Sequence, residues 1–430
     1  MAFPAWLLTF HLQNFVLQFQ AKRPQPLVYI RSLLQGYIHR EDVMLGSLTV
    51  RQILDDDLSI VVLPCSILLD PWNDTVESPN HPRYAVARQM DIFRQRATAP
   101  YLVVFQAWCS NRCRVRRLLC HAVQDWENLQ MDAEEIDQLL QVQVDERPLS
   151  YGPTTGAPAD LEYSLPLSSW AYLYKLRIME WTVQLGFELE MYQPDELAGM
   201  YWYLSYLAKR RASHVERIKA FTVQALNDAR AAGARQGGPA FTAAKEAAFT
   251  RSLSYLRTTM LDAAVTWELA DALSCLYTVL ARAGAVRGPE RPYGSDELRY
   301  EIRMRPFAPI HLPELPSFEA FAAAADQPEN EADAILEYAG RAVAGAKKGY
   351  EALAKFGDKE AFTGCQHARW VAATRNCLKS AIFAGIAIST VQKAIDKAGD
   401  EGEVKVEAEV PAPDKGYHQW WIVPKVTIVP

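Results

Sequence analysis

The sequence has few cysteines and no long hydrophobic run. Seven cysteines are spread over 430 residues, a pattern that argues against a disulfide scaffold and favours free buried thiols in a reducing compartment. No stretch reaches the roughly 18 apolar residues that a membrane span needs. The apolar segment at residues 3–20 lacks a basic leader and a cleavage site, and it contains His11, Gln13 and Asn14. We therefore expect a cytoplasmic protein without a membrane partner.

Short motifs of common catalytic and phosphate-binding sites are also missing. The sequence contains no G-x-S-x-G, G-x-x-x-x-G-K-[ST] or H-E-x-x-H. Residues 235–240, RQGGPA, match an acetyltransferase coenzyme A loop literally. They follow a predicted helix instead of a strand, and Pro239 removes one N–H donor. We interpret this segment as a connecting loop, and we predict no catalytic residue, no cofactor and no metal in this chain.

Charge and composition describe a large globular protein. Half of the residues are hydrophobic and 22% are charged, with a formal net charge of −6. Such a chain can bury a sizeable core in two or three packed units. The acidic balance argues against nucleic acid as the main partner, although local basic patches remain possible.

Proline and glycine clusters divide a mostly helical pattern into regions. We predict a mainly α fold, a multi-helix scaffold with long antiparallel helices and a short C-terminal β-hairpin. The predicted regions are an N-terminal helical region (1–144), a linker (145–160), a central helical platform (161–288), an irregular Pro-rich crossing (289–328) and a C-terminal helical region ending in a strand pair (329–430).

Two long helices dominate the central platform. One is predicted from Pro194 to about Ala232 and the next from Phe241 to about Ala283, because few breakers interrupt either run. Forty helical residues span on the order of 60 Å, and a short loop between them favours an antiparallel pair. No period of 20 to 50 residues repeats, so a tetratricopeptide array is not supported.

The last thirty residues change from a helical to an alternating pattern. Val404, Val406, Ala408 and Val410 alternate with charged residues, and the run at residues 417–423, YHQWWIV, is typical of a strand. We predict that these two runs pair as a hairpin.

The segment from Pro166 to Ile218 is too aromatic for an exposed helical pair. Pro194 suits the first position of the second helix, with Asp195 and Glu196 at its positive end. Aromatic residues then follow so closely that rings point in almost every direction around the axis. Such a helix must be enclosed by protein, and at least one of its rings is expected at an interface, where aromatic residues are enriched.

Two basic clusters and a cysteine stripe are further candidates. One basic cluster consists of Arg112, Arg114, Arg116 and Arg117, and the other of Lys209, Arg210, Arg211, Arg217 and Lys219. Each cluster could contact ribosomal RNA or an acidic partner, or form a solvated face with ion pairs. Cys109, Cys113 and Cys120 fall on one helical stripe, so we expect buried thiols and not a zinc site. The predicted partner-binding residues are Trp170, Trp181, Tyr201, Trp202, Tyr206, Arg112, Arg116, Arg117, Arg210 and Arg211.

The aromatic segment contains the run WxYxxKLRxMEWxVQLGFELEMYxPDELAGMYWYLSYL. This run resembles the central region of the large auxiliary subunit of NatC, a complex that acetylates nascent N-termini. The likeness covers about fifty residues, in which GFELE, the proline-acidic helix start and YWYL recur in order. Weaker likeness extends to residues 25–37 and 377–390. The chain lacks the longer N-terminal part of family members, with its Met-Asp-Pro-Lys-Met-Asp-Ser-Gly-like motif, and therefore looks truncated.

The resemblance implies a non-catalytic role. It implies a scaffold that holds the catalytic acetyltransferase subunit alongside a small auxiliary subunit, and that helps to form the site for N-termini beginning with Met and a large hydrophobic residue. Acetyl-CoA is then expected on the catalytic partner, and ribosome association near nascent polypeptides follows from the same resemblance. A general helical adaptor of an unrelated complex, or an enzyme in its own right, are the alternative interpretations.

Overall fold

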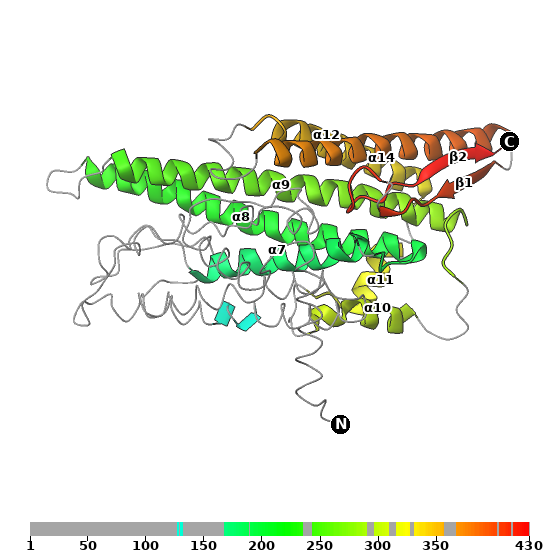
Figure 1. Ribbon diagram of the computed structural model, residues 1–430, viewed down its shortest axis with the longest axis horizontal. Helices are drawn as coiled ribbons and strands as arrows, with labels where there is room; N and C mark the ends of the chain where they lie inside the picture. The colour runs from blue at the N-terminus through cyan, green and yellow to red at the C-terminus, as the bar shows by residue number, and fades with distance from the viewer. Residues whose placement is uncertain are drawn as a thin grey trace, which may run out of the picture.

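The computed structural model shows a row of long helices that lie side by side, with a two-stranded sheet near the C-terminus (Figure 1). The structure describes residues 127–128, 130–131, 167–188, 190–234, 243–289, 296–308, 315–326, 331–356, 367–401, 404–413 and 416–429. The predicted linker, almost all of the predicted N-terminal region and the loop at 235–240 lie outside these residues. The same holds for the cysteine stripe and for Arg112, Arg116 and Arg117.

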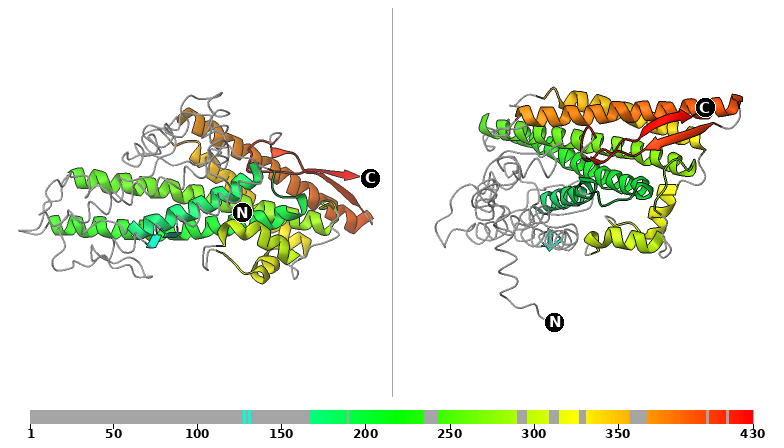
Figure 2. Two further views of the ribbon diagram at one scale, coloured as in Figure 1. Left: turned by 60° about the horizontal axis from the view of Figure 1, so that its bottom comes forward. Right: turned by 45° about the vertical axis from the view of Figure 1, so that its right-hand side comes forward.

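Five long helices form the row, and each packs mainly against the next one along the chain. They are α7 (Leu167–Glu188), α8 (Leu197–Gly233), α9 (Ala243–Arg282), α12 (Ala332–Leu353) and α14 (His367–Glu401). Figure 2 shows the same order from two other directions, with α12 and α14 on the opposite side of α9 from α7. The predicted mainly α fold with long helices is thereby confirmed.

Helices α8 and α9 contain 37 and 40 residues, close to their predicted bounds. Each therefore spans on the order of 55 to 60 Å. Ser274, late in α9, donates a hydrogen bond to the carbonyl of Ala198, early in α8. At the other end of the pair, Arg230 forms an ion pair with Glu246. These two contacts establish the predicted antiparallel arrangement.

Helix α7 is enclosed by protein, and every residue from Met179 to Glu188 is buried. The chain then reverses through Glu190, which has φ +52°, and leads into the short helix η3 (Pro194–Glu196). A side chain at Gly186 would lie 2.1 Å from the hydroxyl of Tyr192. Glycine at this position therefore lets Tyr192 fold back over α7 and sets the angle at which α8 starts.

Tyr201 lies at the centre of the aromatic core. Its ring stacks on Phe187 of α7 at a centroid distance of 4.4 Å, and Tyr277 of α9 and Trp421 both lie 6.1 Å away in near-parallel planes. Rings from α7, from α9 and from the segment before the last strand thus converge on one side chain of α8.

The Tyr201 hydroxyl also fixes the segment near the C-terminus. It donates a hydrogen bond to the carbonyl of Trp420 at 2.9 Å and accepts one from the N–H of Ile422 at 2.7 Å. Tyr277 donates to the carbonyl of Ile422 at 2.8 Å, and Trp420 Nε1 donates to Glu188 at 2.6 Å. Burial strongly raises the pKa of Tyr201, so this hydroxyl stays protonated.

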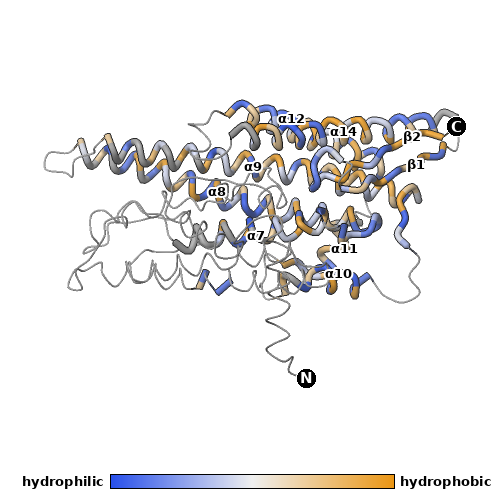
Figure 3. The backbone as a smooth tube through the Cα atoms, viewed as in Figure 1, coloured by the Kyte–Doolittle hydropathy of each residue, from blue (hydrophilic) through white to orange (hydrophobic). Residues whose placement is uncertain are grey.

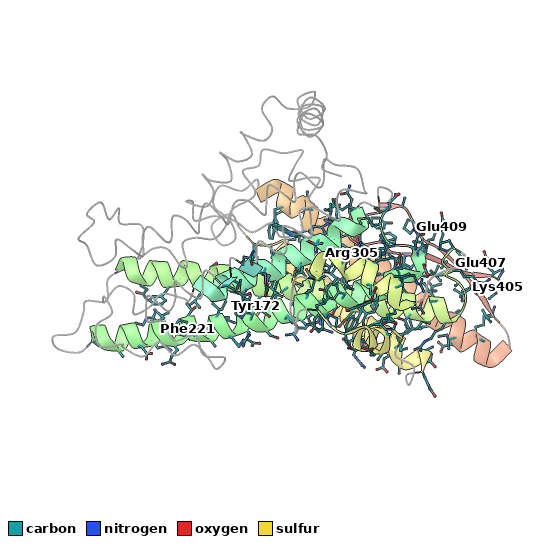
Figure 4. The ribbon with its side chains drawn as sticks, turned by 90° about the horizontal axis from the view of Figure 1, so that it is seen from below. Tyr172, Phe221, Arg305, Lys405, Glu407 and Glu409 are labelled. Atoms are coloured by element: carbon teal, nitrogen blue, oxygen red, sulfur yellow. The ribbon has the colours of Figure 1, made fainter. Side chains whose placement is uncertain are left out.

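The C-terminal strand pair is confirmed, but its second strand is not the predicted one. Strand β1 (Lys405–Glu409) pairs antiparallel with β2 (Lys425–Val429), with Glu407 opposite Thr427. Figure 4 shows Lys405, Glu407 and Glu409 along β1, at the end of the molecule opposite Phe221. Residues 417–423 instead form a tight turn bridged between His418 and Trp421. They cannot join the sheet because the core tyrosines occupy their backbone groups and bury their tryptophans.

Two short helices correct the prediction of an irregular crossing at 289–328. Helices α10 (Asp296–Met304) and α11 (Phe318–Asp326) both lie in this region. The prolines flank these helices or start the short helix η4 (Arg305–Phe307), where proline is compatible with the first turn. Met304 and Phe307 are buried, and this contact with the core anchors the region.

Two described helical stretches are long and apolar enough to cross a membrane by length and composition alone. The first is Leu256–Arg282, whose apolar window is 83% buried, and the second is Trp370–Ala398, whose window is 50% buried. Neither stretch was predicted from the sequence, because polar and charged residues interrupt its apolar run. Burial explains the hydropathy of the first stretch, which has 27 of the 40 residues of α9.

A buried ion cluster joins α7, α8 and α9. Arg211 of α8 lies 2.6 Å from Glu180 of α7 and 2.9 Å from Asp262 of α9, and Arg177 binds the same Glu180 at 2.7 Å. Burial alone would lower the pKa of Arg211, but the two carboxylates outweigh that effect and raise it. Arg211 is only 2% exposed. Its predicted place in a surface basic cluster is therefore wrong.

Replacing Arg211 tests how strongly this cluster stabilises the fold. Arg211→Met leaves Glu180 and Asp262 buried with Arg177 as their remaining cation, and we expect the free energy of unfolding to fall by about 3 kcal/mol. Urea unfolding followed by circular dichroism measures this change. The exposed control Lys219→Met should shift it by less than about 0.5 kcal/mol. A loss below about 1 kcal/mol for Arg211→Met would contradict a structural role for the cluster.

Glu268 predicts a pH-dependent stability difference. Burial, followed by the nearby charge of Asp271, raises the pKa of Glu268, and its carboxylate packs where a side chain of Gly345 would lie. The folded state therefore binds this proton more tightly than the unfolded state does, and stability falls as pH rises above the unfolded pKa. We expect Glu268→Gln to raise Tm at pH 7 and to have no effect below about pH 4, where both states are protonated. Thermal unfolding at the two pH values measures this difference, with Glu301→Gln at an exposed position as the control. An equal rise in Tm at both pH values would refute this explanation.

Candidate partner-binding surface

A ridge of large side chains runs along the outer face of α8. Trp202, Tyr206 and Arg210 are spaced four residues apart, which places them above one another on one side of the helix. The rings of Trp202 and Tyr206 stack at a centroid distance of 5.5 Å, and the guanidinium of Arg210 lies 4.8 Å from the Tyr206 ring centre. We call these three residues the α8 ridge.

Trp202 and Tyr206 are the large side chains in the first three turns of α8 that reach solvent. Between Leu197 and Ala208 only Ala198, Trp202 and Tyr206 are not buried. The ridge residues are half-buried, so their lower edges pack on the core while their upper edges remain accessible. Preformed aromatic side chains with little freedom left to lose are typical of interface hot spots.

Arg210 keeps unused hydrogen-bonding capacity. Its Nε is buried and has no hydrogen-bond partner in the part of the chain that the structure describes. Because this Nε is not accessible, a carboxylate or a backbone carbonyl of a partner would bind the terminal nitrogens of the half-buried guanidinium.

Helix α11 extends the surface beyond the N-terminal end of the ridge. Phe321 packs edge-on against Trp202 at a centroid distance of 5.5 Å. It reaches this position because Gly199 has no side chain, since a Cβ there would lie 2.5 Å from the Phe321 ring. The ridge and α11 therefore form one continuous aromatic surface.

A cavity of about 640 Å³ lies beside Phe321, between η3, the start of α8, the end of α9, α10 and α11. Its apolar lining includes Ala198, Met200 and Phe318, and its charged residues come mainly from η3 and α10. A space of this kind can receive an apolar side chain of a partner.

Paired charges hold the rim of this cavity. Arg303 makes two hydrogen bonds to Glu196, at 2.8 and 2.6 Å, and Arg299 binds Asp195 at 2.5 Å. The two acidic residues lie at the start of α8, where the helix dipole favours negative charge. These pairs attach α10 to the platform and so fix one wall of the cavity.

Tyr300 fixes α10 relative to α11. Its hydroxyl donates a hydrogen bond to the carbonyl of Pro316, just before α11. Burial, with smaller effects of Glu319 and Tyr206, raises the pKa of Tyr300 to about 12, so the hydroxyl remains a donor at neutral pH.

The structure divides the predicted partner-binding residues into three groups. It brings together Trp202, Tyr206 and Arg210, whereas it buries Trp181, Tyr201 and Arg211 in the core, where a partner cannot contact them. The side chain of Trp170 and the whole of Arg112, Arg116 and Arg117 lie outside the described residues. Three further basic residues of the cluster on α8 are Lys209, Arg217 and Lys219. Lys209 forms an ion pair with Asp271, and Arg217 and Lys219 are exposed.

Phe321, Arg299 and Arg303 also line this surface, although they were not predicted from the sequence. The two arginines lie four residues apart and Phe318 and Phe321 lie three apart, and both spacings place the two residues on one helical face. The surrounding prolines concealed these short helical patterns.

Within the described residues, no group of three or more His, Cys, Asp or Glu side chains could hold a metal ion.

Several proteins similar to this chain are named as auxiliary subunits of the NatC complex. The human protein N-alpha-acetyltransferase 35, NatC auxiliary subunit, is 26% identical over 297 residues, which cover 67% of this chain and 37% of the human protein. A homolog of that subunit from Drosophila melanogaster is 26% identical over 217 residues, which cover 49% of this chain and 27% of the fly protein. The chain thus spans less than half the length of these relatives.

Solved structures show the same fold. A chain in the crystal structure of the NatC complex bound to Gag peptide and CoA matches with a TM-score of 0.60 at 17% identity, over 79% of this chain and 48% of that chain. A chain in the NatC complex bound to Arl3 peptide and CoA matches with a TM-score of 0.58. At this identity the likeness concerns the helical fold alone.

A family profile described as NAA35-like, TPR repeats matches residues 4–423. The repeat in this description corrects the prediction that a tetratricopeptide array is unsupported. Helices α8 and α9 contain 37 and 40 residues, each longer than a whole 34-residue repeat. Because single helices run past the length of one repeat, the glycines and prolines that end helices do not recur at the repeat period in the sequence. Because the profile covers nearly the whole sequence, the chain belongs to the NAA35-like family.

Proposed function

We propose that this chain is a non-catalytic platform of a NatC-type N-terminal acetyltransferase. In this proposal it holds the catalytic acetyltransferase subunit together with a small auxiliary subunit. The observation that carries the proposal is family membership over residues 4–423, since relatives in this family are named NatC auxiliary subunits. The α8 ridge supports it, because it is an accessible aromatic surface on a rigid helical row.

The proposed contribution of the chain to catalysis is positional. The catalytic partner binds acetyl-CoA and transfers the acetyl group to an α-amino group, and this chain supplies one wall of the groove for N-termini that begin with Met and a large hydrophobic residue. Holding two reactants in a fixed relative position lowers the barrier that their separate motions would otherwise impose. A platform can do this only if it is stiff, and the ion cluster and the aromatic core around Tyr201 make it so.

The α8 ridge is the proposed contact for the catalytic subunit. Trp, Tyr and Arg are the residue types most enriched among interface hot spots, and the ridge contains one of each. The adjoining cavity beside Phe321 has room for an apolar side chain of the same partner.

The proposed place of action is the cytoplasm, at ribosomes that expose new N-termini. The exposed residues Arg217 and Lys219 on α8 are candidates for an electrostatic contact with ribosomal RNA. They lie beyond the C-terminal end of the ridge on the same helix. The catalytic subunit and the ribosome could therefore bind to separate parts of α8.

Co-expression with the catalytic subunit tests the platform role. We expect the two chains to co-purify, and we expect the acetylation of Met-Leu peptides to increase when this chain is present. Failure to co-purify, or unchanged activity toward these peptides, would exclude the proposed function. Recovery with unrelated proteins only would favour the alternative of a general helical adaptor.

Variants of the ridge test the proposed contact surface. Arg210→Glu and the double variant Trp202→Ala/Tyr206→Ala should each weaken binding of the catalytic subunit at least about tenfold, because hot-spot truncation commonly costs more than about 1.4 kcal/mol. Val223→Ser, an exposed apolar position of the same helix (40% exposed), is the matched control and should bind normally. Tm separates loss of contact from loss of folding. Normal binding by both ridge variants would show that the subunit docks elsewhere, while the platform role itself would stand on the co-purification result.

A further inference from the structure

Helix α14 presents a straight stripe of exposed residues along its outer side. Ile386 is 55% exposed, and Ile382 and Phe383 are each 39% exposed. At about 100° per residue, Arg375, Lys379, Ile382 and Lys393 all lie within about 40° of Ile386 around the helix axis. All of these residues are exposed, so the stripe continues for about 27 Å along the helix.

The stripe has an apolar middle and cationic ends. Arg375 and Lys379 precede the two isoleucines, and Lys393 follows Ile386 by seven residues. Between Arg375 and Lys393 the sequence contains no acidic residue. Figure 3 shows hydrophobic residues along the middle of α14 and hydrophilic residues toward its C-terminal end. The spacing of three and four residues is that of a coiled-coil seam.

The apolar part extends sideways onto the segment before β2. Tyr417 is 41% exposed, and its ring stacks on Phe383 at a centroid distance of 4.2 Å with nearly parallel planes. This pair forms a ledge beside the two isoleucines. The other side of α14 packs on α12, where residues such as Cys377 and Ala384 are buried.

We propose that this stripe docks one amphipathic helix of another protein, with acidic residues on both sides of a short apolar centre. The seam spacing fits a helix that lies along α14, since its apolar residues can pack between Ile382 and Ile386. Its carboxylates then lie about one heptad from the centre, opposite Arg375 and Lys379 at one end and Lys393 at the other. This docking site is independent of the α8 ridge.

Charge excludes a second copy of this chain as the occupant. In an antiparallel pair of α14 helices centred between Ile382 and Ile386, Arg375 of one copy faces Lys393 of the other. In a parallel pair each cation faces its own counterpart. Both orientations oppose like charges, which destabilises helix pairing.

An anionic membrane surface is a poorer match than an acidic helix. A membrane-binding helix needs a broad apolar face along its length, whereas this stripe has two isoleucines and the Phe383–Tyr417 ledge between charged ends.

Binding of designed helical peptides to the full chain tests the proposal. One labelled peptide of about 20 residues carries two central leucines four residues apart and glutamates one heptad to either side, and its matched control has lysines in place of the glutamates. Fluorescence anisotropy should show binding of the acidic peptide that is at least about tenfold tighter at low salt, and salt should reduce the difference. No binding, or equal binding of both peptides, overturns the proposal.

Charge reversal in the chain makes the test independent of simple unfolding. Lys379→Glu/Lys393→Glu should reverse the preference in favour of the lysine peptide, while the circular dichroism spectrum and Tm stay near those of the wild type. Ile386→Asp should weaken the acidic peptide about tenfold while Tm stays near that of the wild type, since this side chain is exposed. An unchanged preference in the double variant overturns the proposal.

The other occupants give distinct results in the same variants. The membrane alternative is tested by co-sedimentation with phosphatidylcholine vesicles that contain about a quarter phosphatidylserine. If the chain co-sediments and Ile386→Asp abolishes this binding, the stripe binds a membrane. A dimer in analytical ultracentrifugation that Ile386→Asp dissociates would assign it to a second copy. Either result overturns the proposal of an acidic partner helix.

Discussion

The hydroxyl of Tyr201 is the interaction on which the arrangement of the platform depends. It is buried among rings from α7, α9 and the segment before β2, and it binds both the carbonyl of Trp420 and the N–H of Ile422. A phenol buried without partners would lose the hydrogen bonds that water gives it. The segment at residues 420–422 must therefore lie against α8, and its two backbone groups are satisfied in return. Through this contact the segment before β2 packs against α7, α8 and α9.

The same helix serves both the core and the surface because its aromatic residues are consecutive. Successive residues of a helix point about 100° apart, so Tyr201 and Tyr203 point into the core while Trp202 points outward. Tyr206 and Arg210 continue the outward direction at four-residue intervals. The buried Tyr201 and the accessible Trp202 are therefore neighbours in the sequence, and the packed core holds the ridge in place. The ion cluster around Arg211 adds a second fixed point further along α8, where α7, α8 and α9 meet.

Local patterns in the sequence predicted the long helices but not the contacts between them. The bounds of α8 and α9 follow from the absence of breakers and from Pro194, and the enclosure of the aromatic helix follows from its ring content. The role of Arg211 could not be predicted in this way, because its partners Glu180 and Asp262 lie 31 and 51 residues away in the sequence. The strand partner of β1 was predicted wrongly for the same reason, since tyrosines more than a hundred residues upstream hold residues 420–422 outside the sheet. Helices α10 and α11 were missed because prolines flank them and their stabilising contacts come from η3 and α8.

The most direct test of this account is a structure of the chain bound to the catalytic subunit of a NatC-type complex, determined by cryo-electron microscopy. The account predicts that the catalytic subunit covers Trp202, Tyr206 and Arg210, while Tyr201 remains enclosed with its hydroxyl between Trp420 and Ile422. A complex in which the ridge stays exposed to solvent, or in which Tyr201 turns outward to contact the partner, would contradict it.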